Sequence, residues 1–342
     1  MTEFRTVPGF EDVWRPPVRQ RIVRPHAVIR PPAPTGGEVR ARLQRIVSHA
    51  PEVMVKVTGR TRDAGHLRAH LDYISRNGGL DLEGSDGALV VGRPEVAELA
   101  DGWAAIVLAD RRRRADSPTS LSVVLSMPAG TNEIGLRDAA RAFASDMFAG
   151  RHDYVFTLHT DTPRPHVHLS ICARGHAGER LNPKKADLEL WRQAFAQALR
   201  DRGVEAEATP RRSRGITRKA ERGPIRRMRV RHEAGRGEPS RVQRAAYQDA
   251  AKAAFRHDAA PRPWELRLLE RQQSVRKLYL AQAALLQRSC DPADRALGLK
   301  VEAFVRTMPG PDTERLALAR QLRAASRDFG PARDDGGKER RR

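Results

Sequence analysis

Hydrophobic residues begin to follow a regular pattern at Val53. Val53, Val55 and Val57 recur at every second position, which is the period of a β-strand with one buried face. Before this point, Arg-Pro sequences interrupt every short apolar run, and proline can sustain neither a helix interior nor a sheet ladder. The pattern therefore predicts a disordered basic arm over residues 1–48 and an ordered domain from residue 49.

Helical and strand patterns alternate in the residues that follow. Leu67, Leu71 and Ile74 recur at helical spacing, which predicts an amphipathic helix from about Gly65 to Asn77. Further patterns predict a second helix after Pro94 with Val96, Leu99, Trp103 and Ile106 facing inward, a strand over 121–126, a helix closed by Gly150, two strands at 154–158 and 167–173, and a helix ended by Gly203. This order implies an α+β domain over 49–210, in which a mainly antiparallel sheet carries helices packed on one face.

The rest of the chain is basic and partly helical. Arginine-rich stretches over 211–239 contain too few apolar residues to bury a core, so they predict a linker. Helical spacing returns over 240–327 without any chemical motif, which predicts a basic helical accessory region at the C-terminal side. Residues 328–342 predict a charged, disordered tail.

The composition points to a polyanionic partner. The formal net charge is +21 and only 5% of the residues are aromatic, so the surface field is strongly positive. Nucleic acid is the leading partner class, with anionic membranes and ribosomal-type RNA binding as alternatives. The sequence contains no run of about 18 apolar residues and no leader at Met1, which predicts a cytoplasmic protein without membrane insertion. Two cysteines, Cys172 and Cys290, are too few for a disulfide framework and fit a reducing compartment.

Three histidines close to two predicted strands form the first candidate site. In a strand that starts at His166, the side chains of His166 and His168 share one face, and pairing with the preceding strand would place His159 beside them. Three neutral imidazoles on a rigid hairpin can hold a metal ion and leave positions open for water or a phosphate oxygen. Asp161 is expected to orient an imidazole by accepting its second N–H. Solvent-facing polar strand residues are the alternative.

Tyr73 lies on the predicted helix over 65–77, beside the buried stripe. His66, His70, Tyr73 and Asn77 share an adjoining face, so the Tyr73 hydroxyl can reach a groove at the edge of the core. Spacing alone favours a packing role with a solvated hydroxyl over a nucleophile.

Three segments resemble motifs I, II and III of conjugative relaxases, of the group that includes the T-DNA border endonuclease. They are Leu-Asp-Tyr-Ile-Ser-Arg-Asn-Gly at 71–78, Leu-Ser-Met-Pro-Ala-Gly-Thr at 125–131 and the histidine segment at 159–168. The resemblance covers about residues 50–225 and implies an HUH-endonuclease-like fold. It also implies that Tyr73 is the nucleophile, that Ser126 lies near the DNA, and that His159, His166 and His168 bind the metal or activate the nucleophile.

The resemblance implies a metal-dependent DNA endonuclease that nicks one strand at an origin of transfer. A Tyr73 adduct with a 5′-phosphate would let a later 3′-hydroxyl rejoin the strand. The implied cofactor is Mg²⁺ or Mn²⁺, with Zn²⁺ or Ni²⁺ as alternatives because imidazole ligands suit them. His159 is either a third ligand or the base that activates Tyr73.

The implied partners are single-stranded DNA, relaxosome accessory proteins and a type IV coupling protein. The resemblance also implies a bacterial cytoplasmic protein that is translocated to a recipient cell with its DNA. It suggests a type IV secretion signal in the arginine-rich tail, for which an ordinary soluble tail is the alternative. Candidate DNA-binding residues are Arg76, Arg164, Arg180, Lys184 and Lys185. Two other functions fit the sequence: a rolling-circle replication initiator with the same chemistry, and a non-catalytic DNA-binding mobilisation protein.

Overall fold

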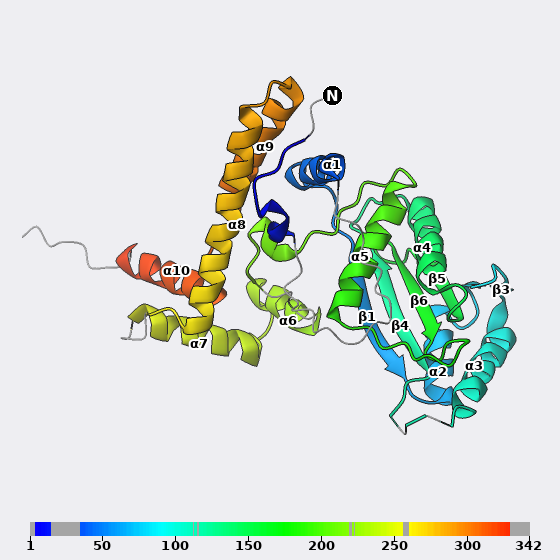
Figure 1. The fold of residues 1–342 in the computed structure, drawn as a ribbon. Coiled ribbons are helices and arrows are strands. Elements are labelled where there is room, and N and C mark those ends of the chain that lie inside the picture. Colours follow the sequence, from blue (N-terminus) through cyan, green and yellow to red (C-terminus); the bar gives the residue numbers. More distant parts are fainter. Residues whose placement is uncertain are drawn as a thin grey trace, which may run out of the picture. The chain divides into compact units, whose positions relative to one another are not determined.

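The chain folds as two compact units, each of which is described by itself. The computed structural model describes residues 4–14, 35–111, 113–114, 116–218, 221, 223–255 and 260–328 (Figure 1). The sheet unit comprises Met1–Phe4 and Arg15–Thr209, and the helical unit comprises Arg5–Trp14 and Pro210–Arg342. The boundary between Thr209 and Pro210 lies where the sequence predicted the α+β domain to close.

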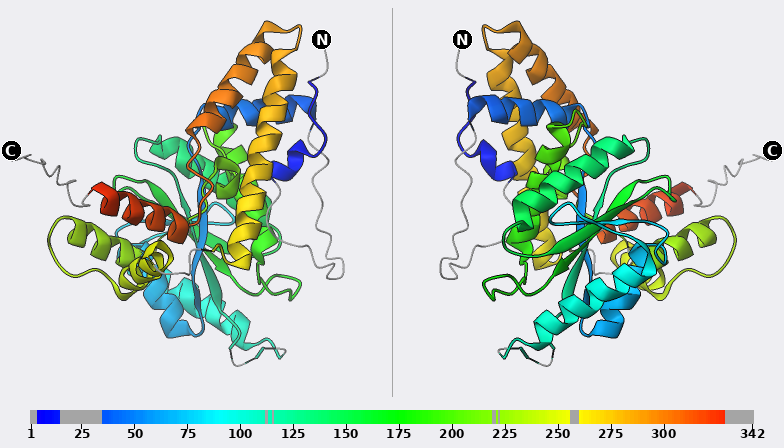
Figure 2. Two further views of the ribbon diagram at one scale, coloured as in Figure 1. Left: turned by 90° about the vertical axis from the view of Figure 1, so that its left-hand side faces the viewer. Right: turned by 90° about the vertical axis from the view of Figure 1, so that its right-hand side faces the viewer.

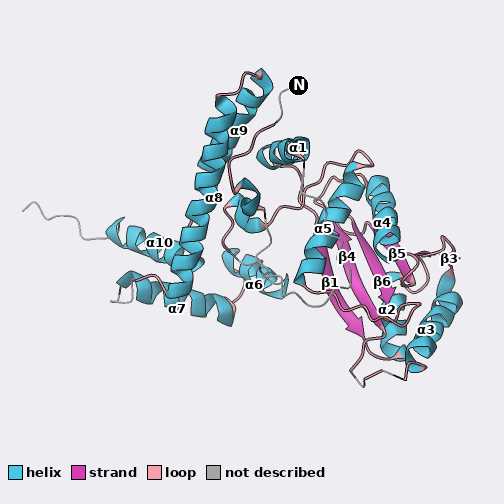
Figure 3. Ribbon diagram, viewed as in Figure 1, coloured by secondary structure: helices cyan, strands magenta, loops and turns pink. Residues whose placement is uncertain are grey.

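A six-stranded sheet forms the centre of the sheet unit. Its strand order is β1-β4-β6-β5-β2-β3, and all neighbouring strands are antiparallel (Figure 3). The strands are β1 (Met54–Thr61), β2 (Leu82–Gly84), β3 (Leu89–Val90), β4 (Ser120–Ser126), β5 (Tyr154–His159) and β6 (His166–Cys172). The α+β fold with an antiparallel sheet is therefore confirmed. Strands β2 and β3 were not predicted because two or three residues are too few to show a two-residue period.

Helices cover both faces of this sheet. Helices α4 (Glu133–Phe148) and α5 (Lys185–Arg200) pack on the face that presents Val123, Leu169 and Ile171. On the other face, α2 (Ala64–Ile74) and α3 (Gly92–Leu108) pack against Val155 and Cys172. The expectation of helices on one face only was wrong, and the central strand β4 shows why, since all seven of its residues are buried. Figure 2 gives two further views of these elements.

Helix α3 departs from its predicted orientation at its C-terminal end. Its buried stripe contains Val96, Ala100, Trp103 and Val107, which follow the α-helical period. Ile106 was expected to face inward, but it lies one position away from this stripe and its side chain is 41% exposed.

The segment before residue 49 is ordered at two places, contrary to the predicted disordered arm. Helix α1 (Gly36–Val47) begins with a capping box between Thr35 and Glu38, and Arg45 donates to the buried Glu207 carboxylate at 2.8 Å. The prediction extended the proline-rich pattern too far and missed this capping signal. Residues 15–34, which contain most of the prolines, lie outside the described residues.

The helical unit has its own core around Tyr279. Phe10 from the 3₁₀-helix η1 (Phe10–Val13) contacts the Tyr279 ring, and Trp14 Nε1 donates to the Tyr279 hydroxyl at 3.2 Å. The other elements are η2 (Arg211–Arg214), α6 (Gly223–Glu233), α7 (Arg241–Phe255), α8 (Pro263–Gln287), α9 (Pro292–Thr307) and α10 (Glu314–Asp328). None of the described side chains of α6 is buried, in keeping with the predicted lack of a core there. The predicted tail beyond Asp328 lies outside the described residues.

Candidate metal and tyrosine site

The three histidines meet at one end of the β5–β6 hairpin. His159 pairs with His166 in the antiparallel register, as the sequence predicted. The ring centroid of His159 lies 4.5 Å from that of His168 and 5.4 Å from that of His166. One ring nitrogen of each histidine lies within 4.8 Å of the others, a spacing at which the three side chains can share a metal ion.

Two of the rings present a nitrogen that has no hydrogen-bond partner among the described residues. His168 Nε2 is buried and accepts no hydrogen bond from the described residues. Burial, reinforced by the neighbouring His159 and His166, lowers the pKa of His168 to about 3, so its imidazole is neutral at physiological pH. His166 Nδ1 donates to the Arg164 carbonyl at 3.1 Å, which leaves its Nε2 as the free lone pair. Both nitrogens are thus suited to a metal ion.

His159 is held more tightly than the other two. Its side chain is buried, and its Nε2 donates to the Ile74 carbonyl at 2.7 Å, which fixes the tautomer with a lone pair on Nδ1. Arg76 Nη2 donates to this Nδ1 at 3.2 Å. Burial lowers the pKa of His159 below its ordinary value, so the ring is available as a neutral ligand or base.

Tyr73 lies at the C-terminal end of α2, against this cluster. Its ring centroid is 5.7 Å from that of His168 and 6.5 Å from that of His159. Its side chain is 55% exposed, which is more than expected of a tyrosine that serves only to fill a core. The Arg76 guanidinium carbon lies 5.6 Å from the Tyr73 ring centroid, within the range of a cation–π contact.

The turn after α2 places Arg76 at the site. Arg76 and Asn77 adopt left-handed backbone conformations with φ of 53° and 58°, and Gly78 follows with φ of 81°. A Cβ atom on Gly78 would lie 2.5 Å from the Arg93 nitrogen, so this position requires glycine. The turn directs the Arg76 side chain back toward His159.

Asp161 has a different partner from the one predicted. Its carboxylate forms an ion pair with Arg76 and not the expected hydrogen bond with an imidazole N–H. Asp161 is therefore linked to His159 only through Arg76, which also donates to His159 Nδ1. The N–H donors of His159 and His166 are taken up by backbone carbonyls, which explains the difference.

Ser126 lies beside the histidines at the end of β4. It is paired with His166 in the register between β4 and β6, and it is buried. Its hydroxyl lies 3.4 Å from the carbonyls of Met127 and Pro165, so it packs against the turn that carries Arg164.

His70, to which no role was assigned from the sequence, forms a polar contact near the cluster. A hydrogen bond of 2.8 Å joins its Nε2 to the Ser122 hydroxyl on β4. Burial and the nearby His66 lower the pKa of His70 to about 4. Its position three residues before Tyr73 on α2 was the available signal, since both residues share a helix face.

The predicted DNA-binding residues do not all gather at this site. Arg76 and Arg164 lie beside the histidines, and Lys184 and Lys185 are exposed at the start of α5. Arg180 lies at the opposite end of the sheet, where it donates to Asp110 Oδ2 at 2.7 Å and to Ser117 Oγ at 2.8 Å.

Comparison with known proteins identifies the domain. A family model described as "Relaxase: MobA/VirD2-like, nuclease domain" matches residues 90–204. The sheet unit contains a MobA/VirD2-like relaxase domain. The residues matched by the family model include Ser126 and the three histidines of the relaxase domain, while Tyr73 lies upstream of them.

The relaxase domain also has curated relatives. The T-DNA border endonuclease VirD2 of Rhizobium radiobacter is 28% identical over 185 residues, which cover 48% of this chain and 43% of that protein. VirD2 of Agrobacterium fabrum is 27% identical over 186 residues, which cover 48% of this chain and 41% of that protein. The matched segments thus span less than half of these relatives.

Two solved structures are similar to the relaxase domain at low identity. The MobM relaxase domain bound to a 26-nucleotide pMV158 oriT DNA is 14% identical, with a TM-score of 0.35, and the match covers 50% of this chain and 95% of MobM. A manganese-bound MobM structure with pMV158 oriT DNA is 13% identical, with a TM-score of 0.36, over 51% of this chain and 96% of MobM.

Among the helices of the described residues, none is sufficiently long and apolar to span a bilayer.

Proposed function

We propose that this chain is a relaxase that nicks one strand of an origin of transfer by attack of Tyr73 on a phosphodiester. The main observation behind this proposal is that the exposed Tyr73 ring lies 5.7 Å from the ring of His168. This histidine is buried, and its Nε2 has no partner among the described residues. A family match to relaxase nuclease domains and similarity to T-DNA border endonucleases support this reaction class.

The histidine cluster fits a divalent metal ion. His166 and His168 would hold it through nitrogens that have no hydrogen bond to the described protein, and His159 would add Nδ1. When bound, the ion would supply positive charge to a non-bridging phosphate oxygen. Mn²⁺ and Mg²⁺ are the proposed ions, with Zn²⁺ or Ni²⁺ as alternatives for three imidazoles.

Tyr73 must lose its phenolic proton as it attacks. Arg76 lies beside this step, since its guanidinium carbon is 5.6 Å from the Tyr73 ring centroid, and its positive charge would stabilise negative charge that develops in the transition state. In the His159 ring, Nδ1 carries the lone pair that could serve as ligand or base, and Arg76 donates a hydrogen bond to this atom. Either role of His159 therefore requires the Arg76 side chain to move toward the phosphate or Asp161.

The attack exchanges one phosphodiester for another. The Tyr73 oxygen forms a bond to phosphorus, the bond to the 3′ oxygen of the leaving strand breaks, and that oxygen takes up a proton. The product is a 5′-phosphotyrosine, which retains an activated ester for later attack by a 3′-hydroxyl. Transfer and rejoining of a strand follow from this reversibility.

The experiment is to incubate the purified chain with end-labelled single-stranded origin DNA and Mn²⁺ or Mg²⁺, and to separate the products on a denaturing gel. Wild type is expected to form a labelled covalent adduct, and Tyr73→Phe to form none. Tyr247→Phe is the matched control because the Tyr247 side chain is 54% exposed, against 55% for Tyr73. DNA binding without an adduct in wild type would favour a non-catalytic mobilisation protein.

A further inference from the structure

A cavity of about 900 Å³ lies at the end of the sheet opposite the histidines. Strand β4 pairs Ser126 with His166 at one end and Ser120 with Cys172 at the other, and the cavity adjoins the second end. The two ends are six residue steps apart along β6, which corresponds to roughly 20 Å at about 3.3 Å per step. The cavity is therefore distinct from the proposed metal site.

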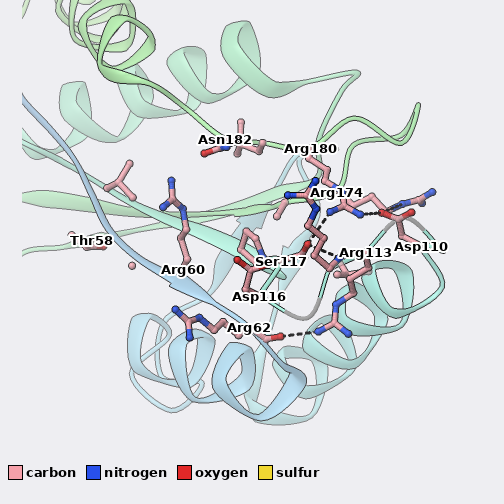
Figure 4. Close-up of a pocket in the computed structure, with 17 residues that line it drawn as sticks. Thr58, Arg60, Arg62, Asp110, Arg113, Asp116, Ser117, Arg174, Arg180 and Asn182 are labelled. Carbon is pink, nitrogen blue, oxygen red and sulfur yellow. Dashed lines mark hydrogen bonds and ion pairs between the residues drawn. The ribbon is translucent and has the colours of Figure 1, made fainter.

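Arginines from three separate segments line this cavity (Figure 4). Figure 4 shows Arg60 and Arg62 on one side, and Arg113, Arg174 and Arg180 on the other. Among the described residues, the charged ones that line the cavity are Arg60, Arg62, Arg113, Arg114, Arg174, Arg180, Asp110 and Asp116. Cations thus outnumber carboxylates at the wall, so the cavity carries a net positive charge.

Internal ion pairs neutralise only part of this charge. Asp110 pairs with Arg180 at 2.7 Å and lies 3.9 Å from Arg174. Arg60 and Arg62 form no ion pair with any residue that the structure describes, and both are exposed. Arg113 Nη2 donates to the Arg62 carbonyl at 3.2 Å, a contact that leaves its charge uncompensated.

Two of the arginines also have a buried Nε donor that makes no hydrogen bond with the described residues. The Nε atoms of Arg113 and Arg174 are buried, and neither has a hydrogen-bond partner in the described part of the chain. Unsatisfied buried donors cost stability, and several like charges in one cavity repel each other. An anion with several acceptor oxygens would offset the repulsion between these charges, and arginine matches phosphate geometry through paired N–H donors.

We propose that this cavity binds the phosphodiester backbone of the DNA strand on which the relaxase domain acts, away from the nicking site. The proposal rests on the proposed function for the identity of the strand. The cavity volume favours several linked nucleotides over a single phosphate. At about 900 Å³ it lies at the upper end of the volumes of pockets that enclose whole small-molecule ligands. The separation of the cavity from the histidine end of the sheet assigns it to a flanking segment of the strand.

Salt-dependent binding of mixed-sequence single-stranded DNA tests the cavity without requiring cleavage. The test protein is the full chain with Arg60→Gln and Arg62→Gln together. The matched control carries Arg137→Gln and Arg151→Gln, which remove the same charge from two exposed positions outside the cavity. Fluorescence anisotropy would give the dissociation constant between about 50 and 200 mM salt.

The cavity pair is expected to weaken binding and to flatten the salt dependence. Each lost contact with a single-strand phosphate should reduce the slope of log K against log salt by about 0.7, so two should reduce it by roughly 1.4. The control pair should leave the slope close to that of wild type. Equal slopes for both pairs would overturn the proposal.

A second experiment distinguishes DNA from a free polyphosphate as the ligand of the cavity. Inorganic triphosphate is added to wild type and to the cavity pair, and thermal unfolding is measured. Stabilisation of wild type alone, together with equal DNA slopes for both pairs, would assign the cavity to a free polyphosphate and overturn the DNA proposal. A reduced slope in the cavity pair supports it even if wild type forms no Tyr73 adduct, a result that would count against the proposed function alone.

Discussion

The two ends of strands β4 and β6 carry opposite chemistry on one scaffold. At the Ser126–His166 end, histidines lose their charge through burial, and the pKa of His168 falls to about 3. At the Ser120–Cys172 end, arginines line an open cavity. Neutral imidazoles can serve as ligands or bases, whereas permanent cations can hold phosphates but cannot exchange protons at physiological pH. The domain thus separates chemistry from strand binding along a single sheet.

Removal of the buried His168 imidazole should have the largest effect on metal binding at the histidine end. His168→Ala is expected to weaken Mn²⁺ binding by more than about 100-fold, because losing even a residue that only supports a metal ligand costs about 10- to 100-fold. Isothermal titration of Mn²⁺ measures this. His152→Ala is the matched control, since His152 is also buried but donates to the Cys172 carbonyl away from the cluster. Equal Mn²⁺ affinity in the two variants would contradict the metal site.

Arg76 is a cation in contact with His159 at the histidine end, and its removal sharpens the comparison. Arg76→Gln is expected to slow adduct formation by about 100-fold, the usual effect of losing one donor that stabilises developing charge. DNA affinity should change far less, because only one phosphate contact is at stake. Single-turnover rates and anisotropy measure the two effects, with Arg141→Gln as control because Arg141 pairs with Glu83 and Asp138. A loss of affinity that accounts for the whole rate effect would place Arg76 with the strand-binding arginines.

The turn that positions Arg76 depends on Gly78. Gly78→Ala is expected to lower the free energy of unfolding by more than about 2 kcal/mol, because it combines a positive φ with a backbone clash. Gly87→Ala has a similar φ of 83° but open space around its Cβ position, so it should cost only about 1 kcal/mol. Urea-induced unfolding measures both. Equal losses would mean that the clash with Arg93 is relieved at no cost.

Acid should destabilise the histidine end through His70. Its pKa is about 4 in the folded chain and near 6.5 when unfolded, so the unfolded state binds more protons between these values. Stability is therefore lost as the pH falls from about 6.5 to about 4. His70→Gln should reduce this slope by at most about 1.4 kcal/mol per pH unit.

His176 provides the control of opposite sign. A hydrogen bond to Asp153 raises its pKa, so its contribution is present below about 6.5 and is lost as the pH rises through the folded-state pKa. His176→Gln should not reduce the acid-side slope. If His70→Gln left that slope unchanged, the burial of a neutral His70 would be contradicted.

The sequence predicted the histidine end far better than the arginine end, for a physical reason. His159, His166 and His168 lie on one hairpin, so strand periodicity and one register suffice to bring them together. The arginines of the cavity come from β1, from the loop after α3 and from the segment after β6. Their approach depends on the pairing of β1, β4 and β6, which is not visible in any short segment. The sequence predicted Arg180 to bind DNA, but it did not show that this residue lines a cavity together with the other arginines.

The helices on the second face of the sheet show the same limit. The sequence predicted α2 and α3 as helices, but their side of the sheet depends on the connections between strands, which local periodicity does not specify. The hydrogen bond of His70 with Ser122 and the contact of Arg76 with His159 both arise from this packing. Local patterns gave the candidate residues, and tertiary packing decided which of them touch.

The most direct measurement of the central claim is to map the attachment site and polarity of the covalent product. Single-stranded origin DNA, labelled at either the 5′ or the 3′ end, is reacted with wild type and Mn²⁺ and then digested with trypsin. Mass spectrometry should find the nucleotide on the peptide that contains Tyr73, and only the 3′ label should remain attached, as a 5′-phosphotyrosine requires. Attachment to another residue, or retention of the 5′ label, would contradict the account.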